Sequence, residues 1–453
     1  MPTSHRSRAA LDAVVRESRT PGIQYLVVDA DGTLFEYAGG WADLSSHRPM
    51  TLGTTMMAYS MSKTITAAAA LQLVEARKIA LDDAIDRYIE SPYGPQVTVR
   101  HLLSHTSGIP NPIPLRWVHA VENRADFRED AALAAVLQKH GRLSAPPGTK
   151  YVYSNIGYWI LGPILERVSG ESFIDYVRNH VLDPLGIAPE ALGYAVVNPA
   201  THATGYLEKF SLFNLIKRFL IDAALIGEYE GPWLRIRAHY ANGPAFGGLV
   251  GAARAFAAFL RDQLRPHSCL FDVPTRNLFY EPQQTETGTP IAMTLGWHVG
   301  AADGARFFYK EGGGGGFDSM MRIYPAAGVG TVGHDQRDRI RRPSCPGCGR
   351  SGLCELIAAT AIANDVRVGM RPVRFFEDQG ARLLRVRAPT KVWDSRRRCE
   401  RHRSRLALRK QRADLFHRAP YLVVHEHATQ FNSRRRRVST DAGGGLGLAF
   451  CGS

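Results

Sequence analysis

The chain has 453 residues, of which 45% are hydrophobic and 22% are charged, a balance that is ordinary for a globular protein. The net charge of +14 is confined to one end, since residues 1–333 carry 30 Lys+Arg against 31 Asp+Glu and residues 334–453 carry 26 against 11. Residues 1–333, the body of the chain, therefore lack the positive charge of a nucleic-acid-binding surface. Only residues 334–453 carry enough positive charge for that role.

No stretch reaches the ~20 uncharged apolar residues that a membrane-spanning helix needs. The N-terminus lacks the apolar core of a signal peptide, so we expect none. Five of the six cysteines lie after residue 333, which leaves Cys269 alone in the body and indicates no internal disulfide framework there. These features favour a cytoplasmic protein with no membrane span.

The predicted elements follow a strand, helix, strand order. Residues 22–40 read as a hairpin around an Asp31-Gly32 turn, and residues 62–78 read as an Ala/Leu-rich helix. Further helices are predicted over 154–166, 210–227 (amphipathic) and 249–264, and strands over 292–299, 306–309, 320–324 and 329–332. This order predicts one sheet, built from about 10–60 and 290–332, with a helical insertion at about 80–290.

Ser60 and Lys63 form the first chemical motif, in the sequence Ser-Met-Ser-Lys. A serine hydroxyl needs a base within hydrogen-bond reach, and residues three apart share one face of a helix. At a helix start, free backbone N–H groups favour developing negative charge. Ser60 is thus a candidate nucleophile and Lys63 its candidate base, although this short motif is weak by itself.

Two later motifs add to the first. Tyr153 and Asn155 stand in Tyr-Ser-Asn, where a phenol can relay protons and an amide can hold a lysine or a substrate carbonyl. Ser154 or Asn155 is also a candidate helix N-cap. The third motif runs from Lys310 through Glu311 into five glycines, where the backbone can approach a substrate and supply an oxyanion hole with Ser60. By itself this glycine run would also suit a flexible hairpin loop.

Together these motifs resemble the penicillin-recognising serine hydrolase superfamily, which includes class C β-lactamases, D-Ala-D-Ala carboxypeptidases, D-aminopeptidases and related esterases. The resemblance covers roughly residues 10–332 and extends to residues 101–108, 247–249 and 322–325. It implies an α/β (α+β) β-lactamase/penicillin-binding-type fold, an antiparallel sheet flanked by helices with an inserted helical domain. Residues 1–332 would form the hydrolase domain and residues 333–453 an Arg/Cys-rich tail.

The resemblance also implies roles for individual residues. The catalytic residues would be Ser60 as the acylated nucleophile, Lys63 as its activating partner and Tyr153 as the general acid/base. The substrate-binding residues would be Asn155, Lys310, Gly312 and Gly313, with the amides of Ser60 and Gly313 as the oxyanion hole. Glu311 replaces the small hydroxyl residue usual after this lysine in β-lactamases, which disfavours a β-lactam carboxylate.

Two other patterns suggest different chemistry. Ser104-His105 could belong to a Ser-His-Asp triad, but adjacent residues rarely orient as nucleophile and base, so we expect a structural turn. Asp29 and Asp31 reproduce the D-x-D-G-T-L motif of haloacid-dehalogenase-type phosphatases. There the aspartate ends a parallel strand and binds Mg²⁺, whereas here the chain continues as a strand after an Asp-Gly turn. A hairpin is the preferred interpretation, with the phosphatase as a remote alternative.

The tail changes composition abruptly at about residue 333. It contains 24 Arg against 2 Lys, and Cys345, Cys348 and Cys354 suggest a zinc knuckle only weakly because no fourth ligand is evident. Three interpretations stay open: a nucleic-acid-binding extension, a disordered basic segment, and a reading-frame change near codon 333 that replaced an apolar strand and helix.

The sequence therefore predicts a serine hydrolase that cleaves an ester, amide or peptide bond of a small molecule through a Ser60 acyl-enzyme. This chemistry requires no cofactor and no metal. The competing class is a non-catalytic protein on the same scaffold, or one that binds nucleic acid through the tail.

Overall fold

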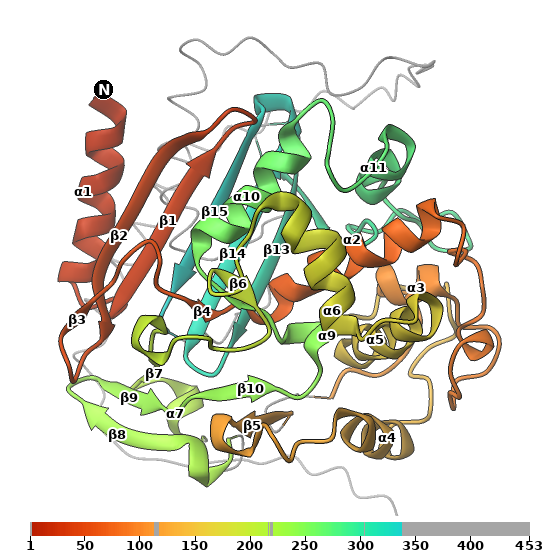
Figure 1. The fold of residues 1–453 in the computed structure, drawn as a ribbon, viewed down its shortest axis with the longest axis horizontal. Coiled ribbons are helices and arrows are strands. Elements are labelled where there is room, and N and C mark those ends of the chain that lie inside the picture. Colours follow the sequence, from red (N-terminus) through yellow and green to blue (C-terminus); the bar gives the residue numbers. More distant parts are fainter. Residues whose placement is uncertain (1, 113–116, 216, 218–220, 303, 338–453) are drawn as a thin grey trace, which may run out of the picture. The chain divides into compact units, whose positions relative to one another are not determined.

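A seven-stranded antiparallel sheet lies at the centre of the computed structural model, which describes residues 2–112, 117–215, 217, 221–302 and 304–337 (Figure 1). The strand order is β12-β13-β14-β15-β1-β2-β3. The strands are β1 (Gly22–Val28), β2 (Thr33–Asp43), β3 (Arg48–Pro49), β12 (His298–Ala302), β13 (Ala305–Gly314), β14 (Phe317–Tyr324) and β15 (Val329–Asp335). Both ends of the described chain thus meet in one sheet, where β1 pairs with β15.

Helices cover both faces of this sheet. They are α1 (Pro2–Arg16), α2 (Ser62–Glu75), α3 (Val99–Leu103), α4 (Glu129–Lys139), α5 (Asn155–Ser169), α6 (Phe173–Val177), α7 (Leu212–Leu215), α9 (Pro244–Gly247), α10 (Ala253–Leu264) and α11 (Val273–Tyr280). In Figure 1, α1 lies along β2 at one edge, whereas α10 lies over β1 and β15 on the opposite face.

Side chains along β1 alternate between two hydrophobic clusters, one on each face of the sheet. Ile23 and Tyr25 pack with Leu11 of α1, whereas Leu26 and Val28 face the main core beneath α2, α5 and α10. Side chains two apart on a strand share one face, so a nearly continuous apolar strand is covered on both sides.

The region between β3 and β12 contains short strands as well as the predicted helices. They are β4 (Met56–Met57), β5 (Val118–Ala120), β6 (Leu192–Gly193), β7 (Gly205–Glu208), β8 (Ile226–Glu230), β9 (Trp233–Ile236), β10 (His239–Ala241) and β11 (Val250–Gly251). They form one two-stranded and two three-stranded sheets. The insertion is therefore mixed in structure, and the expectation of a helical one was incomplete.

The N-terminal hairpin agrees with its prediction. β1 and β2 pair antiparallel, and the carboxylate of Asp29 accepts hydrogen bonds from the backbone N–H groups of Asp31 and Gly32 at 2.9 and 2.7 Å. This side chain closes a turn between antiparallel strands. The parallel strand that the phosphatase alternative requires is absent at this position.

Two predicted elements are wrong. A continuous helix over 210–227 does not form, because its described part contains the single turn α7, a 3-10 turn at Ala223–Leu225 and the start of β8. The predicted strand 292–299 is mostly a loop, since Thr294 to Trp297 form a turn with Gly296 at φ +113° and β12 begins only at His298.

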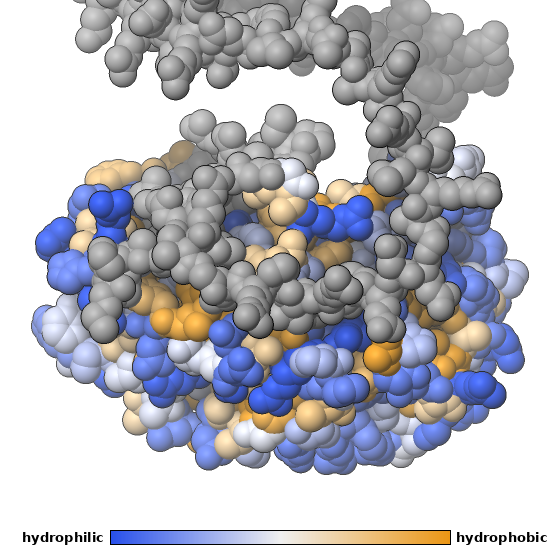
Figure 2. All heavy atoms as spheres, turned by 90° about the horizontal axis from the view of Figure 1, so that it is seen from above, coloured by the Kyte–Doolittle hydropathy of each residue, from blue (hydrophilic) through white to orange (hydrophobic). Residues whose placement is uncertain are grey.

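The last strand runs further than the predicted boundary at residue 332. β15 continues to Asp335, with Gly333 paired to Tyr25 and to Met320. The predictions for Cys345, the arginine-rich runs and the rest of 338–453 lie outside the described residues. Within the described ranges, no helix combines the length and apolarity needed to cross a membrane, and the face in Figure 2 shows polar and apolar side chains side by side.

Candidate active site

Ser60 lies where a 3-10 turn, Tyr59–Met61, leads into α2. Tyr59, directly before it, has φ +43°, a left-handed conformation that bulky residues rarely adopt. The Tyr59 hydroxyl donates to Nε2 of His239 at 2.7 Å, because Nδ1 of that ring faces the Arg237 carbonyl oxygen at 2.9 Å. This bond holds the turn that presents the half-buried Ser60.

Lys63 is fully buried one helical turn beyond Ser60. Its Nζ lies 3.0 Å from Ser60 Oγ, 2.7 Å from Asn155 Oδ1 and 2.6 Å from the carbonyl oxygen of Phe246. A neutral amine has two N–H groups and one lone pair. Since the amide and carbonyl oxygens only accept, they take the two N–H groups and leave the lone pair for the hydroxyl proton of Ser60.

Burial, and secondarily the charge of Lys310, hold the pKa of Lys63 well below its ordinary value. Both lysines are fully buried, and Lys310 Nζ lies 5.5 Å from the ring centroid of Tyr153. A lowered pKa increases the share of free amine at a given pH, and the free amine is the form that a general base requires.

Tyr153 completes the contact with the candidate nucleophile. Its hydroxyl donates to Ser60 Oγ at 2.8 Å, and its ring centroid lies 5.2 Å from Lys63 Nζ. The next residue, Ser154, is the N-cap of α5 and accepts from the N–H of Gly157, as one of the two predicted caps. The start of α5 therefore fixes the direction of Tyr153.

The glycine run is a closely packed hairpin and not a loose loop. β13 pairs with β14 through Gly314, and a Cβ atom on Gly312 would lie 2.0 Å from the Ala58 carbonyl oxygen. Ser319 of β14 donates to that same oxygen at 2.9 Å. Gly312 thus brings the edge of β13 against the turn that carries Ser60, which places the Gly313 backbone near the nucleophile's turn.

Three contributors to the site lie outside the three motifs. Oδ1 of Asn111 accepts from both the N–H and the Nδ2 of Asn155, at 3.0 and 3.1 Å, which turns Oδ1 of Asn155 toward Lys63. The Phe246 carbonyl comes from α9. His105 is fully buried beneath Tyr153, with ring centroids 4.3 Å apart. His105 lies in residues 101–108, to which the resemblance extends, but the sequence predicts no role for it beneath Tyr153.

The Ser104-His105 pair is a structural turn. Ser104 Oγ donates to the Arg100 carbonyl oxygen at 2.7 Å, while Nδ1 of His105 accepts from the N–H of Ser154 at 3.1 Å. The two side chains point to different partners, so they form no nucleophile–base pair. Burial, together with the charges of Lys310 and Lys63, also keeps the pKa of His105 well below its usual range.

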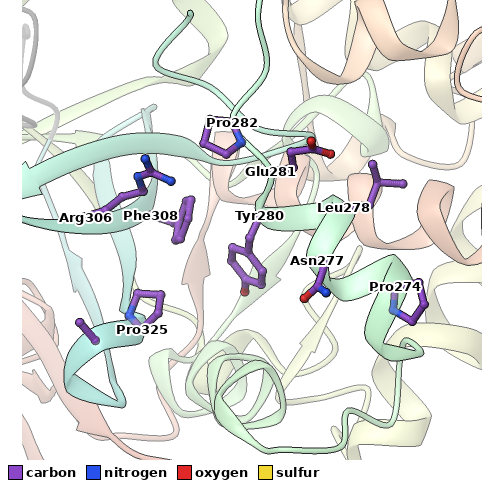
Figure 3. A pocket seen from close by; sticks show the side chains of 10 residues that line it. Pro274, Asn277, Leu278, Tyr280, Glu281, Pro282, Arg306, Phe308 and Pro325 are labelled. Carbon is purple, nitrogen blue, oxygen red and sulfur yellow. The ribbon is translucent and has the colours of Figure 1, made fainter. Parts of the chain in front are cut away.

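A cavity of about 1040 Å³ between α11 and β13 lies away from these residues. Figure 3 shows Tyr280, Phe308 and Pro325 around it, with Arg306 and Glu281 at its sides. None of its lining residues belongs to the three motifs. The hydroxyl, amine and phenol at Ser60, Lys63 and Tyr153 therefore define the candidate site better than cavity size does.

A serine hydroxyl in hydrogen-bond contact with a buried lysine and a tyrosine, on an antiparallel sheet covered by helices, is the arrangement expected of a serine hydrolase. The Beta-lactamase family model matches residues 8–338, and the chain belongs to that family of serine hydrolases.

Individual relatives vary in how much of them the chain covers. Penicillin-binding protein 4 of Amycolatopsis lactamdurans is 28% identical over 73% of this chain and 84% of its own length. A D-aminopeptidase of Cereibacter sphaeroides is 31% identical over 44% of this chain, but the match spans only 38% of that enzyme. The solved D-amino acid amidase from Ochrobactrum anthropi SV3 shares the fold, with a TM-score of 0.66, 19% identity and coverage of 80% of this chain and 99% of its own.

Proposed function

We propose that this protein hydrolyses small esters and amides, peptides included, through an acyl-enzyme on Ser60. The observation that carries the proposal is the position of Ser60 Oγ, 3.0 Å from the Lys63 amine and 2.8 Å from the Tyr153 hydroxyl. A base and an acid thus both reach the hydroxyl that would react.

In the first half-reaction, Ser60 Oγ attacks the substrate carbonyl carbon while its proton moves to Lys63 Nζ. The bond between the carbonyl carbon and the leaving group then breaks, and Tyr153 gives its phenolic proton to the leaving amine or alkoxide. The proton on Lys63 returns to the tyrosine. In the second half-reaction, water gives up a proton to the same pair, attacks the acyl group and releases the acid with Ser60 restored.

The developing negative charge on the carbonyl oxygen needs hydrogen-bond donors in a fixed position. We assign this role to the backbone N–H groups of Ser60 and Gly313. The close approach of Gly312 to the Ala58 carbonyl oxygen supports this assignment, because it brings the backbone of β13 next to the Ser60 turn. Asn155 and Lys310 would hold and polarise the bound substrate.

The substrate class follows from the residue beside Lys310. Glu311 places a carboxylate where β-lactamases have a small hydroxyl residue, and like charges repel a substrate carboxylate. Uncharged esters and amino-acid amides avoid that repulsion. The similarity to a D-aminopeptidase supports amides as the first substrates to test.

A substrate panel tests the proposal. p-Nitrophenyl esters, D- and L-amino-acid amides and nitrocefin would be compared on the full-length protein, on Ser60→Ala and on the control Ser104→Ala. We expect ester and amide turnover to exceed nitrocefin turnover, to vanish in Ser60→Ala and to persist in Ser104→Ala, since Ser104 bonds only within its turn. Turnover that survives in Ser60→Ala would contradict the assignment.

A further inference from the structure

A second, smaller cavity of about 170 Å³ lies where β5, β10, α9 and the start of α4 meet. Its walls include His119, Arg124, Phe127, Glu129, Tyr194 and Tyr240. None of these residues belongs to the catalytic motifs. The proposal below is therefore independent of the proposed function.

His119 presents an unused acceptor in this cavity. Its Nδ1 lies 2.9 Å from Oδ1 of Asn242, which only accepts, so Nδ1 carries the proton. Burial keeps the pKa of His119 below its ordinary value, with Arg124 acting in the same direction, so the ring is neutral at neutral pH. The lone pair of Nε2 is then buried and has no partner among the described residues.

Tyr194 presents an unused donor. Its side chain is 7% exposed, and its hydroxyl is buried without a partner in the described part of the chain. Burial raises the pKa of this phenol, with the nearby carboxyl of Glu129 as a second cause, so the hydroxyl keeps its proton. An unpaired buried hydroxyl costs about 1–3 kcal/mol, which makes a partner in the cavity favourable.

Two charged groups of opposite sign flank these atoms. Oε1 of Glu129 accepts from the indole N–H of Trp159 at 3.0 Å, and burial raises the pKa of this carboxyl to about 7. Arg124 donates to the Tyr194 carbonyl oxygen at 2.8 Å, and its guanidinium lies 4.4 Å from the ring centroid of Tyr240. The arginine disfavours a cation in the cavity, and an ionised Glu129 disfavours an anion. A neutral occupant satisfies both.

We propose that this cavity is a binding site for a small neutral carboxamide. The two N–H groups of the amide match the acceptors at His119 Nε2 and Glu129, and its carbonyl oxygen matches the Tyr194 hydroxyl. A planar group also suits the aromatic wall, where the rings of His119 and Phe127 stack with centroids 4.0 Å apart and 10° between planes. The size fits as well, because a protein cavity of about 150 Å³ holds benzene.

Three molecules of one shape test the proposal. Benzamide, acetophenone and benzoate would be titrated against the full-length protein by ligand-observed NMR at pH 8.5, where Glu129 is mostly ionised. We expect benzamide to bind at least tenfold more tightly than either of the others, since acetophenone lacks the N–H donors and benzoate carries a charge. Equal binding of all three, tighter binding of benzoate, or no binding of benzamide would overturn the proposal.

Variants locate the bound molecule. Tyr194→Phe removes one hydroxyl without changing shape, and His119→Phe keeps the stacked ring but removes Nε2. Each should weaken benzamide binding at least fivefold, and each serves as the check if the other fails to fold. Tyr93→Phe alters a buried tyrosine outside the cavity, and Ser60→Ala alters the catalytic site; both should leave benzamide binding unchanged. Binding that is lost in Ser60→Ala but kept in Tyr194→Phe would place benzamide in the catalytic site and contradict the proposal.

Discussion

At the scale of single residues, the site depends on two buried lysines close to one tyrosine. Lys63 and Lys310 are fully buried, and both ammonium positions lie within 5.5 Å of the ring centroid of Tyr153. Burial penalises the charged form of Lys63, and the charge of Lys310 penalises it further. Lys310 therefore helps to keep Lys63 in the free-amine form that the mechanism needs.

Removing the charge at position 310 should change the pH profile. In Lys310→Met the pKa of Lys63 should rise, so its free amine appears only at higher pH. The acidic limb of the kcat/KM profile should therefore shift to higher pH. Lys310→Arg keeps the charge and should leave that limb in place, even if turnover falls. The measurement is kcat/KM for one neutral ester between pH 5 and 9. An unmoved limb in Lys310→Met would contradict this electrostatic role.

Asn111 should act as a positioning residue through Asn155. Asn111→Ala removes the acceptor of two hydrogen bonds, at 3.0 and 3.1 Å, that orient the Asn155 amide toward Lys63. With two hydrogen bonds at about 1 kcal/mol each, kcat should fall by up to roughly thirtyfold, with a smaller change in KM. Steady-state kinetics and thermal melting would be measured together.

The conservative variant Asn111→Asp separates this role from a general structural one. It keeps the accepting oxygen and adds a negative charge near Lys63, so kcat should largely recover while the acidic limb moves to higher pH. A loss equal to that of Asn111→Ala, with an unmoved limb, would show that orientation of Asn155 is not the cause.

The sequence indicated Ser60, Lys63, Tyr153, Asn155 and Lys310 because their motifs have characteristic spacing, and the structure brings all five together. It gave no indication of Asn111 or of the Phe246 carbonyl. Their contacts join residues 44 and 183 positions apart, and a backbone carbonyl is present whatever the side chain. Only the folded chain shows such partners.

At the scale of elements, the glycine run forms a hairpin in which a larger residue at Gly312, Gly315 or Gly316 would clash with its neighbours. A Cβ on Gly315 would lie 2.1 Å from the Tyr59 hydroxyl, and one on Gly316 would lie 2.2 Å from the Tyr206 backbone nitrogen. The same run therefore packs against the residue before the nucleophile and against β7. The run is therefore part of the paired strand edge that the motifs favoured, and the alternative of a loose hairpin loop is wrong.

Gly312→Ala should test this packing. The added methyl group would lie 2.0 Å from the Ala58 carbonyl oxygen and must push β13 from the Ser60 turn. We expect destabilisation of about 1–3 kcal/mol and loss of most of the hydrolytic activity. Gly32→Ala, where a Cβ meets nothing within 4 Å, is the matched control. Denaturant unfolding and ester turnover measure both effects, and an active, stable Gly312→Ala protein would refute the account.

The two wrong elements have physical causes. The alternating Met293, Leu295 and Trp297 resemble a strand, and all three are fully buried, but they pack into the core from a turn. In 210–227 the apolar side chains instead pack against neighbouring strands, since Ile221 and Leu225 lie in one cluster with Leu207 of β7 and Leu234 of β9. Periodicity reports which residues are buried, and tertiary contacts decide the backbone conformation.

At the scale of the whole molecule, residues near the end of the described chain tie distant parts together. Gln336 follows β15 and is fully buried, and its Nε2 donates to the carbonyl oxygens of Ala42 at 2.6 Å and Thr204 at 2.9 Å. Its backbone N–H donates to Gly22 at 3.2 Å. The abrupt change in composition that the sequence shows at residue 333 thus falls inside a packed region.

Gln336→Leu should therefore lower global stability. The buried carbonyl oxygens of Ala42 and Thr204 would each lose a donor, although that of Ala42 keeps the Thr204 N–H at 2.9 Å, so the free energy of unfolding should fall by about 1–3 kcal/mol. Gln138→Leu, on the exposed face of α4, should change that free energy by less than about 0.5 kcal/mol. Chemical denaturation of both variants makes the comparison, and equal stabilities would show that this junction contributes nothing.

Covalent labelling followed by peptide mass spectrometry tests most directly whether Ser60 forms the acyl-enzyme. The full-length protein would be treated with a fluorophosphonate probe, digested and mapped, with Ser60→Ala and Ser104→Ala alongside. The account predicts one added probe group on the peptide that contains Ser60, unchanged in Ser104→Ala and absent in Ser60→Ala. A folded wild-type protein that stays unlabelled, or labelling that persists in Ser60→Ala, would contradict it.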